Sequence, residues 1–295
     1  MESGNGRLVV SGFGSRRMRL AILADIHGNL HALEAVLADI ERQSVDLIVV
    51  NGDLVNRGPA NVAVLDRVRS LDAVVTLGNH DDLVRKWIDR DADIPADWYE
   101  DPFWLSTAWC ARQVVAADRL DDLRALPMTH RIEVPGAPSV LVAHGSPRHY
   151  REGYGRRLTD ERIAEIVAEH PADVLVGSHT HRPLERRWNG HLVLNTGAVG
   201  APQNEDSRAQ YLLLTLRDGQ WQHEFRPVPY DHDAAVAAFE ATGFLAEGGL
   251  SALLFREDLR LAKDVYGAFT RWCEAAGRPP TWDAWRAFGE LPGSP

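Results

Sequence analysis

The fold is decided by one stretch of the chain, Asp46-Leu47-Ile48-Val49-Val50-Asn51-Gly52-Asp53-Leu54-Val55-Asn56-Arg57-Gly58-Pro59. In this stretch a short apolar run is followed by Gly-Asp and by a polar turn with one arginine. Apolar runs of this length between turn residues are typical of buried parallel strands. Asp53 would lie where the strand leaves the sheet, and open α/β sheets bind their ligands at that edge. We therefore expect a binding site around Asp53.

Strands and helices alternate around this stretch. Residues 19–24 form an apolar run that ends at Asp25, and residues 30–42 carry apolar side chains at helical spacing. After the central strand we expect a helix near residues 62–71 and a strand at 73–77. This alternation predicts a parallel sheet with right-handed crossovers, and thus the α/β class.

The later part of the chain divides into further elements. Residues 83–127 have a helical pattern and are expected to be an insertion beside the sheet. Further strands are predicted at 139–143, 173–176, 192–195, 211–216 and 221–225, with a helix over 159–169. From Tyr230 the pattern is helical to the end. We therefore expect a disordered tail over residues 1–17, a principal domain over 18–230 and a helical C-terminal extension over 231–295.

The composition limits the classes of function. The chain has 295 residues and a formal net charge of −10, which argues against nonspecific nucleic-acid binding. No apolar run approaches the ~18–20 residues needed to cross a membrane. The two cysteines, Cys110 and Cys273, do not make a disulfide framework, so we expect a cytoplasmic protein.

Five predicted strand ends carry side chains of the types that bind metal ions. These side chains are Asp25 and His27, Asp53, Asn79, His144, and His179 and His181. Residues two apart in an extended backbone point to the same side, so each such pair can serve one site. Histidine and carboxylate ligands suit Mn²⁺, the expected metal, with Fe, Zn²⁺ or Ni²⁺ as alternatives. Seven ligands fit two divalent ions, for which Asp53 is the expected bridge.

Five segments of the chain together resemble the signature blocks of the calcineurin-like metallophosphoesterase superfamily. They are Asp25-x-His27, Gly52-Asp53, Gly78-Asn79-His80-Asp81, His144-Gly145 and Gly177-x-His179-x-His181. The resemblance covers about residues 18–230 and implies a four-layer α/β/β/α sandwich with a dimetal centre at one edge.

The resemblance also implies roles for the site residues. The first metal would take Asp25, His27, Asp53 and His181, and the second would take Asp53, Asn79, His144 and His179. A metal-bridging hydroxide would attack phosphorus. His80 would stabilise the transition state or protonate the leaving oxygen, as a general acid does.

The turn Gly52–Pro59 is similar to the Gly-Asp-x-Val-Asp-Arg-Gly block of protein Ser/Thr phosphatases and symmetrical diadenosine tetraphosphatases. By this resemblance Arg57 holds a phosphate oxygen. Asn56 departs from the pattern, because those enzymes have an aspartate there, paired with the histidine that matches His80. An amide cannot stabilise an imidazolium as a carboxylate does. Either Asp81 takes over this role, as a further catalytic residue, or His80 is a weaker acid–base group.

The function expected from these features is hydrolysis of nucleotide or other small phosphodiesters. The His-Gly-Ser-Pro segment at His144 looks more like the small bacterial phosphodiesterase branch. A phosphomonoesterase, a protein Ser/Thr phosphatase or a diadenosine polyphosphate hydrolase is the alternative supported by Arg57. An inactive binding scaffold on the same fold is a remote alternative, since no ligand is missing.

The segments expected to set specificity lie outside the metal ligands. In the basic loop 148–158, the candidate substrate-binding residues are Arg148, His149 and Arg156. The partner would be a small phosphorylated substrate. The sequence leaves open whether the C-terminal helices cap the sheet or form a homodimer.

Overall fold

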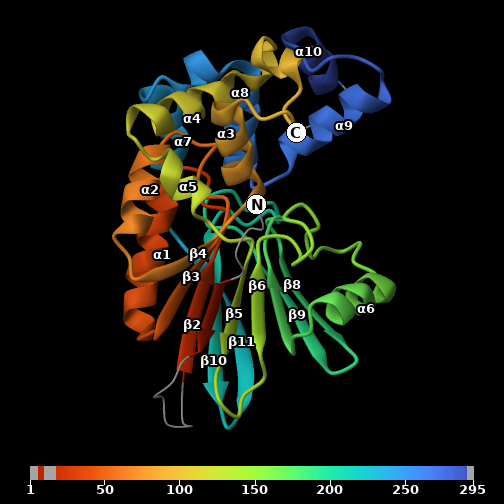
Figure 1. The fold of residues 1–295 in the computed structure, drawn as a ribbon. Helices are drawn as coiled ribbons and strands as arrows, with labels where there is room; N and C mark the ends of the chain where they lie inside the picture. Colours follow the sequence, from red (N-terminus) through yellow and green to blue (C-terminus); the bar gives the residue numbers. More distant parts are fainter. Residues whose placement is uncertain (1–5, 10–17, 291–295) are drawn as a thin grey trace.

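Two β-sheets lie face to face in the computed structural model, which describes residues 6–9 and 18–290 (Figure 1). The five-stranded sheet has the order β11-β10-β2-β3-β4. Its strands are β2 (Met18–Leu23), β3 (Leu47–Asn51), β4 (Ala73–Thr76), β10 (Ala209–Arg217) and β11 (Gln220–Val228). β2, β3 and β4 are parallel, whereas β10 runs antiparallel to β2 and β11.

The six-stranded sheet has the order β1-β5-β6-β7-β9-β8. Its strands are β1 (Gly6–Val9), β5 (Thr129–Glu133), β6 (Val140–Ala143), β7 (Val174–Gly177), β8 (Pro183–Trp188) and β9 (His191–Thr196). β6, β7 and β9 are parallel to one another. β5 and β8 were not expected from the sequence.

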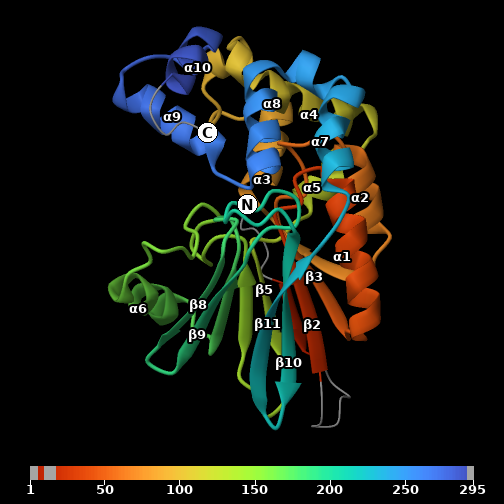
Figure 2. The same ribbon diagram turned by 180° about the vertical axis from the view of Figure 1, so that it is seen from behind.

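Helices cover the outer face of each sheet. α1 (Leu30–Gln43) and α2 (Asn61–Arg69) lie on the five-stranded sheet, and α6 (Asp160–Glu169) lies on the six-stranded sheet (Figures 1 and 2). The side chain of Thr159 caps α6 by accepting from the N–H of Arg162. The order of layers is thus α/β/β/α, and the predicted four-layer sandwich is confirmed.

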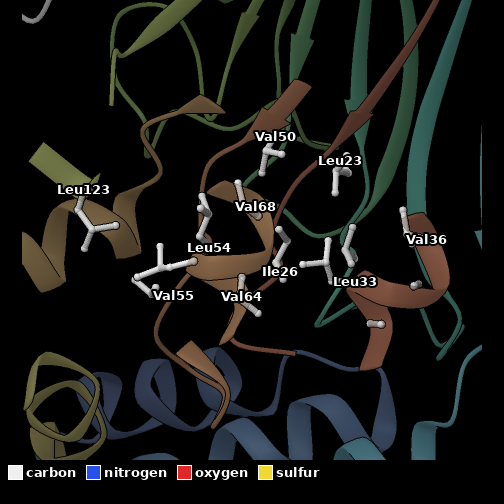
Figure 3. Packing of buried hydrophobic residues seen from close by; sticks show 14 of the residues in the cluster. Leu23, Ile26, Leu33, Val36, Val50, Leu54, Val55, Val64, Val68 and Leu123 are labelled. Carbon is white, nitrogen blue, oxygen red and sulfur yellow. The ribbon is translucent and has the colours of Figure 1, made fainter. Parts of the chain in front are cut away.

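Alternation along β2 separates two of the cores. Leu20 and Ile22 point between the two sheets, where they pack in one apolar cluster with strands of both. Ala21 and Leu23 point the other way, into the cluster beneath α1 and α2. Figure 3 shows this second cluster, in which Leu23 lies among side chains from α1, α2 and the turn after β3. Both faces of the strand are buried, which explains its unbroken apolar run.

The predicted insertion and the C-terminal segment are both helical. The insertion holds α3 (Asn79–Asp89), η1 (Ala96–Tyr99), η2 (Pro102–Trp104), α4 (Leu105–Ala116) and α5 (Leu120–Arg124). The C-terminal helices are α7 (His232–Ala241), α8 (Phe244–Leu261), α9 (Val265–Ala275) and α10 (Trp282–Gly289). The two segments pack together: Trp109 of α4 contacts Phe244 of α8, with ring centres 4.6 Å apart. They form one helical layer over the end of the sheets where β2 and β3 stop (Figure 2).

The N-terminal region differs from the expectation of a tail. Gly6–Val9 form β1, which pairs in parallel with β5. The predicted disordered tail is therefore wrong for these residues, because the open edge of β5 offers backbone groups to a further strand. Residues 1–5 and 10–17 lie outside the described residues.

The division of the chain into a principal domain and a C-terminal extension at residue 230 stays a prediction. β11 ends at Val228 and α7 begins at His232. Over residues 6–9 and 18–290, no helix is long and apolar enough to cross a membrane.

Candidate active site

The ends of the parallel strands bring the seven predicted metal ligands to one place. They are Asp25, His27, Asp53, Asn79, His144, His179 and His181; all are buried except His179, which is half-buried. Backbone hydrogen bonds join the segments that carry them: Asp25 N–H donates to the carbonyl of Gly52, and His27 N–H to that of Asp53. The turns after β2 and β3 therefore form one rigid base for the site.

Two groups of ligand atoms could each hold a cation. The first is Asp25, His27 and His181, and the second is Asp25, Asp53 and His144. Oδ1 of Asp25 lies 3.3 Å from Nε2 of His181 and 3.8 Å from Nε2 of His144. Oδ2 of Asp53 lies 3.3 Å from Nε2 of His144 and 3.6 Å from Nε2 of His27. Both carboxylates reach both groups, so the predicted bridge by Asp53 has a second candidate in Asp25.

Asn79 and His179 adjoin the second group. Oδ1 of Asn79 lies 2.7 Å from Nδ1 of His179 and 3.2 Å from Nε2 of His144. The pair His179 and His181 is thus divided, with His181 beside His27 and His179 beside Asn79. This division matches the ligand sets that the resemblance implies.

The backbone at five of these ligands is in the left-handed region, whereas we expected an extended backbone for the pairs two residues apart. Asp25, His27, Asp53, His179 and His181 all have φ between 49° and 65°. Residues other than glycine rarely adopt this backbone conformation, and such backbone strain concentrates at functional sites. The tight turns after the strands thus direct closely spaced side chains into one site.

The hydrogen bonds of the ligands fit metal binding. Nδ1 of His144 donates to the carbonyl of Asn51 (2.8 Å), and Nδ1 of His181 donates to the carbonyl of Ala201 (2.6 Å). These bonds commit Nδ1 of both rings, so Nε2 is the nitrogen that would bind a metal. Oδ1 of Asp25 is buried and has no hydrogen-bond partner among the described residues. A buried carboxylate oxygen without a donor needs a cation.

The electrostatics of the site favour positive charge. Burial disfavours the charged form of His144, but the carboxylates of Asp53 and Asp25 outweigh it and raise its pKa to about 10. Burial acts against the ionised form of Asp53 too, yet His144 and His80 hold its pKa well below the ordinary value. The carboxylate of Asp53 therefore stays ionised and can hold a cation.

His80 lies in the first turn of α3, beside the metal ligands. The backbone N–H of His80 donates to Oδ1 of Asp53 (2.7 Å). The ring Nδ1 of His80 lies 3.2 Å from Nδ2 of Asn56. Burial, assisted by the positive charge of Arg57, lowers the pKa of the ring to about 3 despite the carboxylate of Asp53. His80 is thus a neutral ring beside the site.

Asn56 fixes the proton on that ring. Oδ1 of Asn56 accepts from the N–H of Arg57 (2.9 Å), so its amide nitrogen must face His80. The amide also donates to Oγ1 of Thr107 in α4 (3.3 Å). Nδ1 of His80 therefore accepts, and its proton is on Nε2.

Asp81 does not replace the missing carboxylate. Its Oδ1 accepts from the N–H groups of Leu54 and Val55, and its Oδ2 from those of Asp53 and Gly78. The predicted catalytic role of Asp81 is therefore corrected. Asp81 holds the turn after β3 against the start of α3, and each of its two carboxylate oxygens accepts two backbone hydrogen bonds. Burial and the charge of Asp53 raise its pKa to about 7.

Arg57 is paired with a residue that the sequence did not single out. Its Nη2 donates to Oδ2 of Asp258 in α8, and its Cζ lies 5.0 Å from the ring centre of Phe255. Nε of Arg57 is buried and has no hydrogen-bond partner in the part of the chain that the structure describes. The guanidinium is therefore partly neutralised, and its Nε–H is a buried donor whose hydrogen bond is not made within the described residues.

The family profile described as calcineurin-like phosphoesterase matches residues 18–183, more than half of the chain, a range that includes the seven predicted metal ligands. The chain belongs to the calcineurin-like phosphoesterase family. The predicted superfamily and the predicted class, a phosphoester hydrolase, are thereby confirmed. The family uses a dinuclear divalent metal centre, which the two groups of ligands in this phosphoesterase fit.

Three relatives are similar to this phosphoesterase, two of them over most of its length and one over a smaller part. An uncharacterized protein of Methanocaldococcus jannaschii is 25% identical over 227 residues, 72% of this chain and 88% of that protein. A crystal structure of a metallophosphoesterase from Sphaerobacter thermophilus superposes with a TM-score of 0.65 and 27% identity, covering 84% of this chain and 100% of that one. The symmetrical bis(5′-nucleosyl)-tetraphosphatase of Pectobacterium carotovorum is 34% identical over 122 residues, 38% of this chain and 43% of that enzyme.

The basic loop of the phosphoesterase differs from its expected role. Arg148 donates to Glu152, Glu165 and Glu169, so its guanidinium is committed to carboxylates. These bonds argue against the predicted substrate contact. His149 and Arg156 are exposed, and Nδ1 of His149 accepts from the N–H of Arg151. Their contact with substrate stays a prediction.

Two residues that contact the turn carrying Asn56 and Arg57 were missed from the sequence. Thr107 and Asp258 lie in helices outside the metal-binding segments, and both are buried. Nothing in their local sequence distinguishes them from other helix residues. Only the packing of α4 and α8 over the site reveals them.

Proposed function

We propose that this phosphoesterase hydrolyses small phosphodiesters, including those of nucleotides. The observation that carries the proposal is the pairing of Arg57 with Asp258. A phosphomonoester carries about −1.5 to −2 charges at pH 7, whereas a diester carries one. An arginine already neutralised by a buried aspartate favours the diester, because less positive charge remains for a second phosphate charge.

The residues that would hold the metals are the seven predicted ligands, divided as the family resemblance implies. Asp25, His27, Asp53 and His181 would hold one divalent ion, and Asp53, Asn79, His144 and His179 the other. Bound ions neutralise phosphate charge and lower the pKa of water. We expect Mn²⁺, because its ligand preferences match histidine with carboxylate.

His80 and Arg57 would act on the substrate itself. With its proton on Nε2, His80 donates a hydrogen bond to a phosphate or leaving-group oxygen. The unpartnered Nε–H of Arg57 would donate to a second phosphate oxygen. In the resting enzyme His80 is a neutral donor and not an imidazolium.

Hydrolysis of a dinucleoside polyphosphate is the second candidate. It is supported by the similarity to the tetraphosphatase of Pectobacterium carotovorum and by the turn that carries Arg57. That similarity spans less than half of either chain. The cytoplasmic location and the homodimer stay predictions, with Cys110 and Cys273 both buried and free.

The test compares three substrates of the Mn²⁺-loaded protein: bis(4-nitrophenyl) phosphate, 4-nitrophenyl phosphate and diadenosine tetraphosphate. We expect the highest kcat/KM for the diester and its loss in His80→Ala. A strong preference for the monoester would contradict the proposal, and a preference for the tetraphosphate would select the second candidate. Fewer than one bound ion per chain would instead favour an inactive scaffold.

A further inference from the structure

A cavity of about 180 Å³ lies between the metal-binding turns and the C-terminal helices. His27 and Arg57 line it on the side of the active site, and Ala238, Phe239, Phe255 and Leu259 of α7 and α8 line the opposite side. One metal ligand and the phosphate-binding arginine therefore face the same space as two phenylalanines. A phosphate in the active site would lie at the mouth of this cavity.

Two polar side chains around the cavity are already engaged, whereas Nε of Arg57 and Nδ1 of His27 are buried without a partner among the described residues. Nδ2 of Asn29 donates to the carbonyl of Gly200 (3.0 Å) and also lies 3.4 Å from the hydroxyl of Tyr230. The hydroxyl of Thr242 donates to the carbonyl of Ala238 (2.7 Å). The cavity thus presents mainly carbon to a ligand. Its occupant must be apolar where it meets α7 and α8.

The size and shape of the cavity suit one planar ring. An apolar cavity of about 150 Å³ is enough to bind benzene. The guanidinium of Arg57 lies over the Phe255 ring, so a flat cationic and aromatic surface forms part of the wall. Aromatic rings of ligands stack on such surfaces.

We propose that this cavity binds the aromatic ring of an ester group of the substrate, either a nucleobase or a simple aryl group. The inference rests on the proposed function, since the phosphate of the same molecule would occupy the metal site. One wall of the cavity comes from α7 and α8, which lie beyond residues 18–183 that the family profile matches. The C-terminal helices would thus select the substrate of this chain.

The test measures binding, not turnover, with phosphonates that cannot be hydrolysed. Methylphosphonate, phenylphosphonate and an adenine-bearing alkylphosphonate are titrated into the Mn²⁺-loaded full-length protein by calorimetry. Burial of one ring should tighten binding by at least about tenfold relative to methylphosphonate. A gain for the adenine compound identifies a nucleobase, and a gain for phenylphosphonate alone identifies an aryl ester.

Two matched variants locate the ring. Ala238→Phe fills the cavity and should abolish the ring preference while leaving methylphosphonate affinity unchanged. Ala237→Phe adds the same side chain at the next, exposed position of α7, outside the cavity, and should keep the preference. If Ala238→Phe does not fold, Thr242→Phe at the exposed rim serves the same purpose.

The outcomes separate this inference from the proposed function. Equal affinities for all three phosphonates, or a ring preference that persists in the cavity-filling variant, would overturn the aromatic site alone. If no phosphonate binds although Mn²⁺ is bound, the proposed function fails, and the aromatic site fails with it.

Discussion

Nη2 of Arg57 donates a hydrogen bond to Oδ2 of Asp258, a residue 201 positions further along the chain. Oδ1 of Asp258 accepts from the N–H groups of Val265 (2.7 Å) and Tyr266 (2.8 Å) at the start of α9. One buried carboxylate thus holds the active-site arginine and the junction of α8 with α9. The C-terminal helix α8 is therefore joined directly to Arg57, a residue of the candidate active site.

Removing the charge of Asp258 should change substrate preference. In Asp258→Asn the guanidinium of Arg57 loses its counter-charge, so it can meet the second charge of a phosphomonoester. We expect the ratio of diester to monoester kcat/KM to fall by several-fold, with the larger change in the monoester KM. Steady-state kinetics with the two 4-nitrophenyl substrates measures it.

The control for this variant is Glu257→Gln, which removes a neighbouring carboxylate of α8 that pairs with Arg256 and Arg260. It should leave the ratio unchanged. An unaltered ratio in Asp258→Asn, with the protein folded, would show that the ion pair does not set the preference.

Restoring a carboxylate at position 56 should change the protonation of His80. In Asn56→Asp the new carboxylate accepts from Nδ1 and raises the ring pKa from about 3. An imidazolium is then present below the raised pKa and is lost as pH rises through it. We expect kcat/KM for the diester to fall as pH rises through this raised pKa in the variant. The natural protein should show no such fall.

Thr107→Val is the control for the Asn56 variant, because it removes the other partner of the amide without adding charge. Its pH profile should keep the shape of the natural one. Identical profiles for Asn56→Asp and the natural protein would show that His80 does not act as an acid in the rate-limiting step.

Loss of Asp25 should reduce metal content. Oδ1 of Asp25 reaches both groups of ligands and has no other partner among the described residues. We expect Asp25→Asn to bind fewer than two Mn²⁺ per chain and to lose more than 100-fold in kcat. Elemental analysis after Mn²⁺ loading measures the first effect, with exposed His149→Asn as the control that should keep two ions.

Removal of metal by a chelator should also lower the thermal midpoint of the natural protein, because ions that bind only the folded state stabilise it. A midpoint that does not move, in a protein shown to have lost its ions, would contradict a metal site built from buried carboxylates.

The ligands could be predicted from the sequence because each follows an apolar strand, and parallel strands end at one edge. Local patterns do not state how a side chain is used. Asp81 was expected beside His80, but four N–H groups surround its carboxylate, an outcome of how two turns meet. Arg148 was expected to bind the substrate, yet α6 brings two carboxylates to it. Asp258 follows no motif, and only the packing of α8 brings it to Arg57.

Asp39 offers a pH-dependent test of the fold away from the active site. Its buried carboxylate accepts from Nε of Arg226 (2.8 Å) and from the hydroxyl of Tyr211 (2.7 Å), and so joins α1 to β10 and β11. The hydrogen bond from Arg226 is the main reason that its pKa falls from 3.8 to about 2. Because the lower pKa belongs to the folded state, this stabilisation is complete above about pH 4 and is lost as pH falls through 2.

We therefore expect Asp39→Asn to lower the free energy of unfolding by about 2 kcal/mol at pH 7. At pH 2 the difference between variant and natural protein should be much smaller, because the natural carboxyl is then largely protonated. Urea unfolding at both pH values measures it. Asp66→Asn, which removes a carboxylate exposed at the surface and paired with Arg119, should cost less than about 1 kcal/mol at either pH. A loss in Asp39→Asn that is equal at both pH values would mean that packing, and not charge, makes Asp39 stabilising.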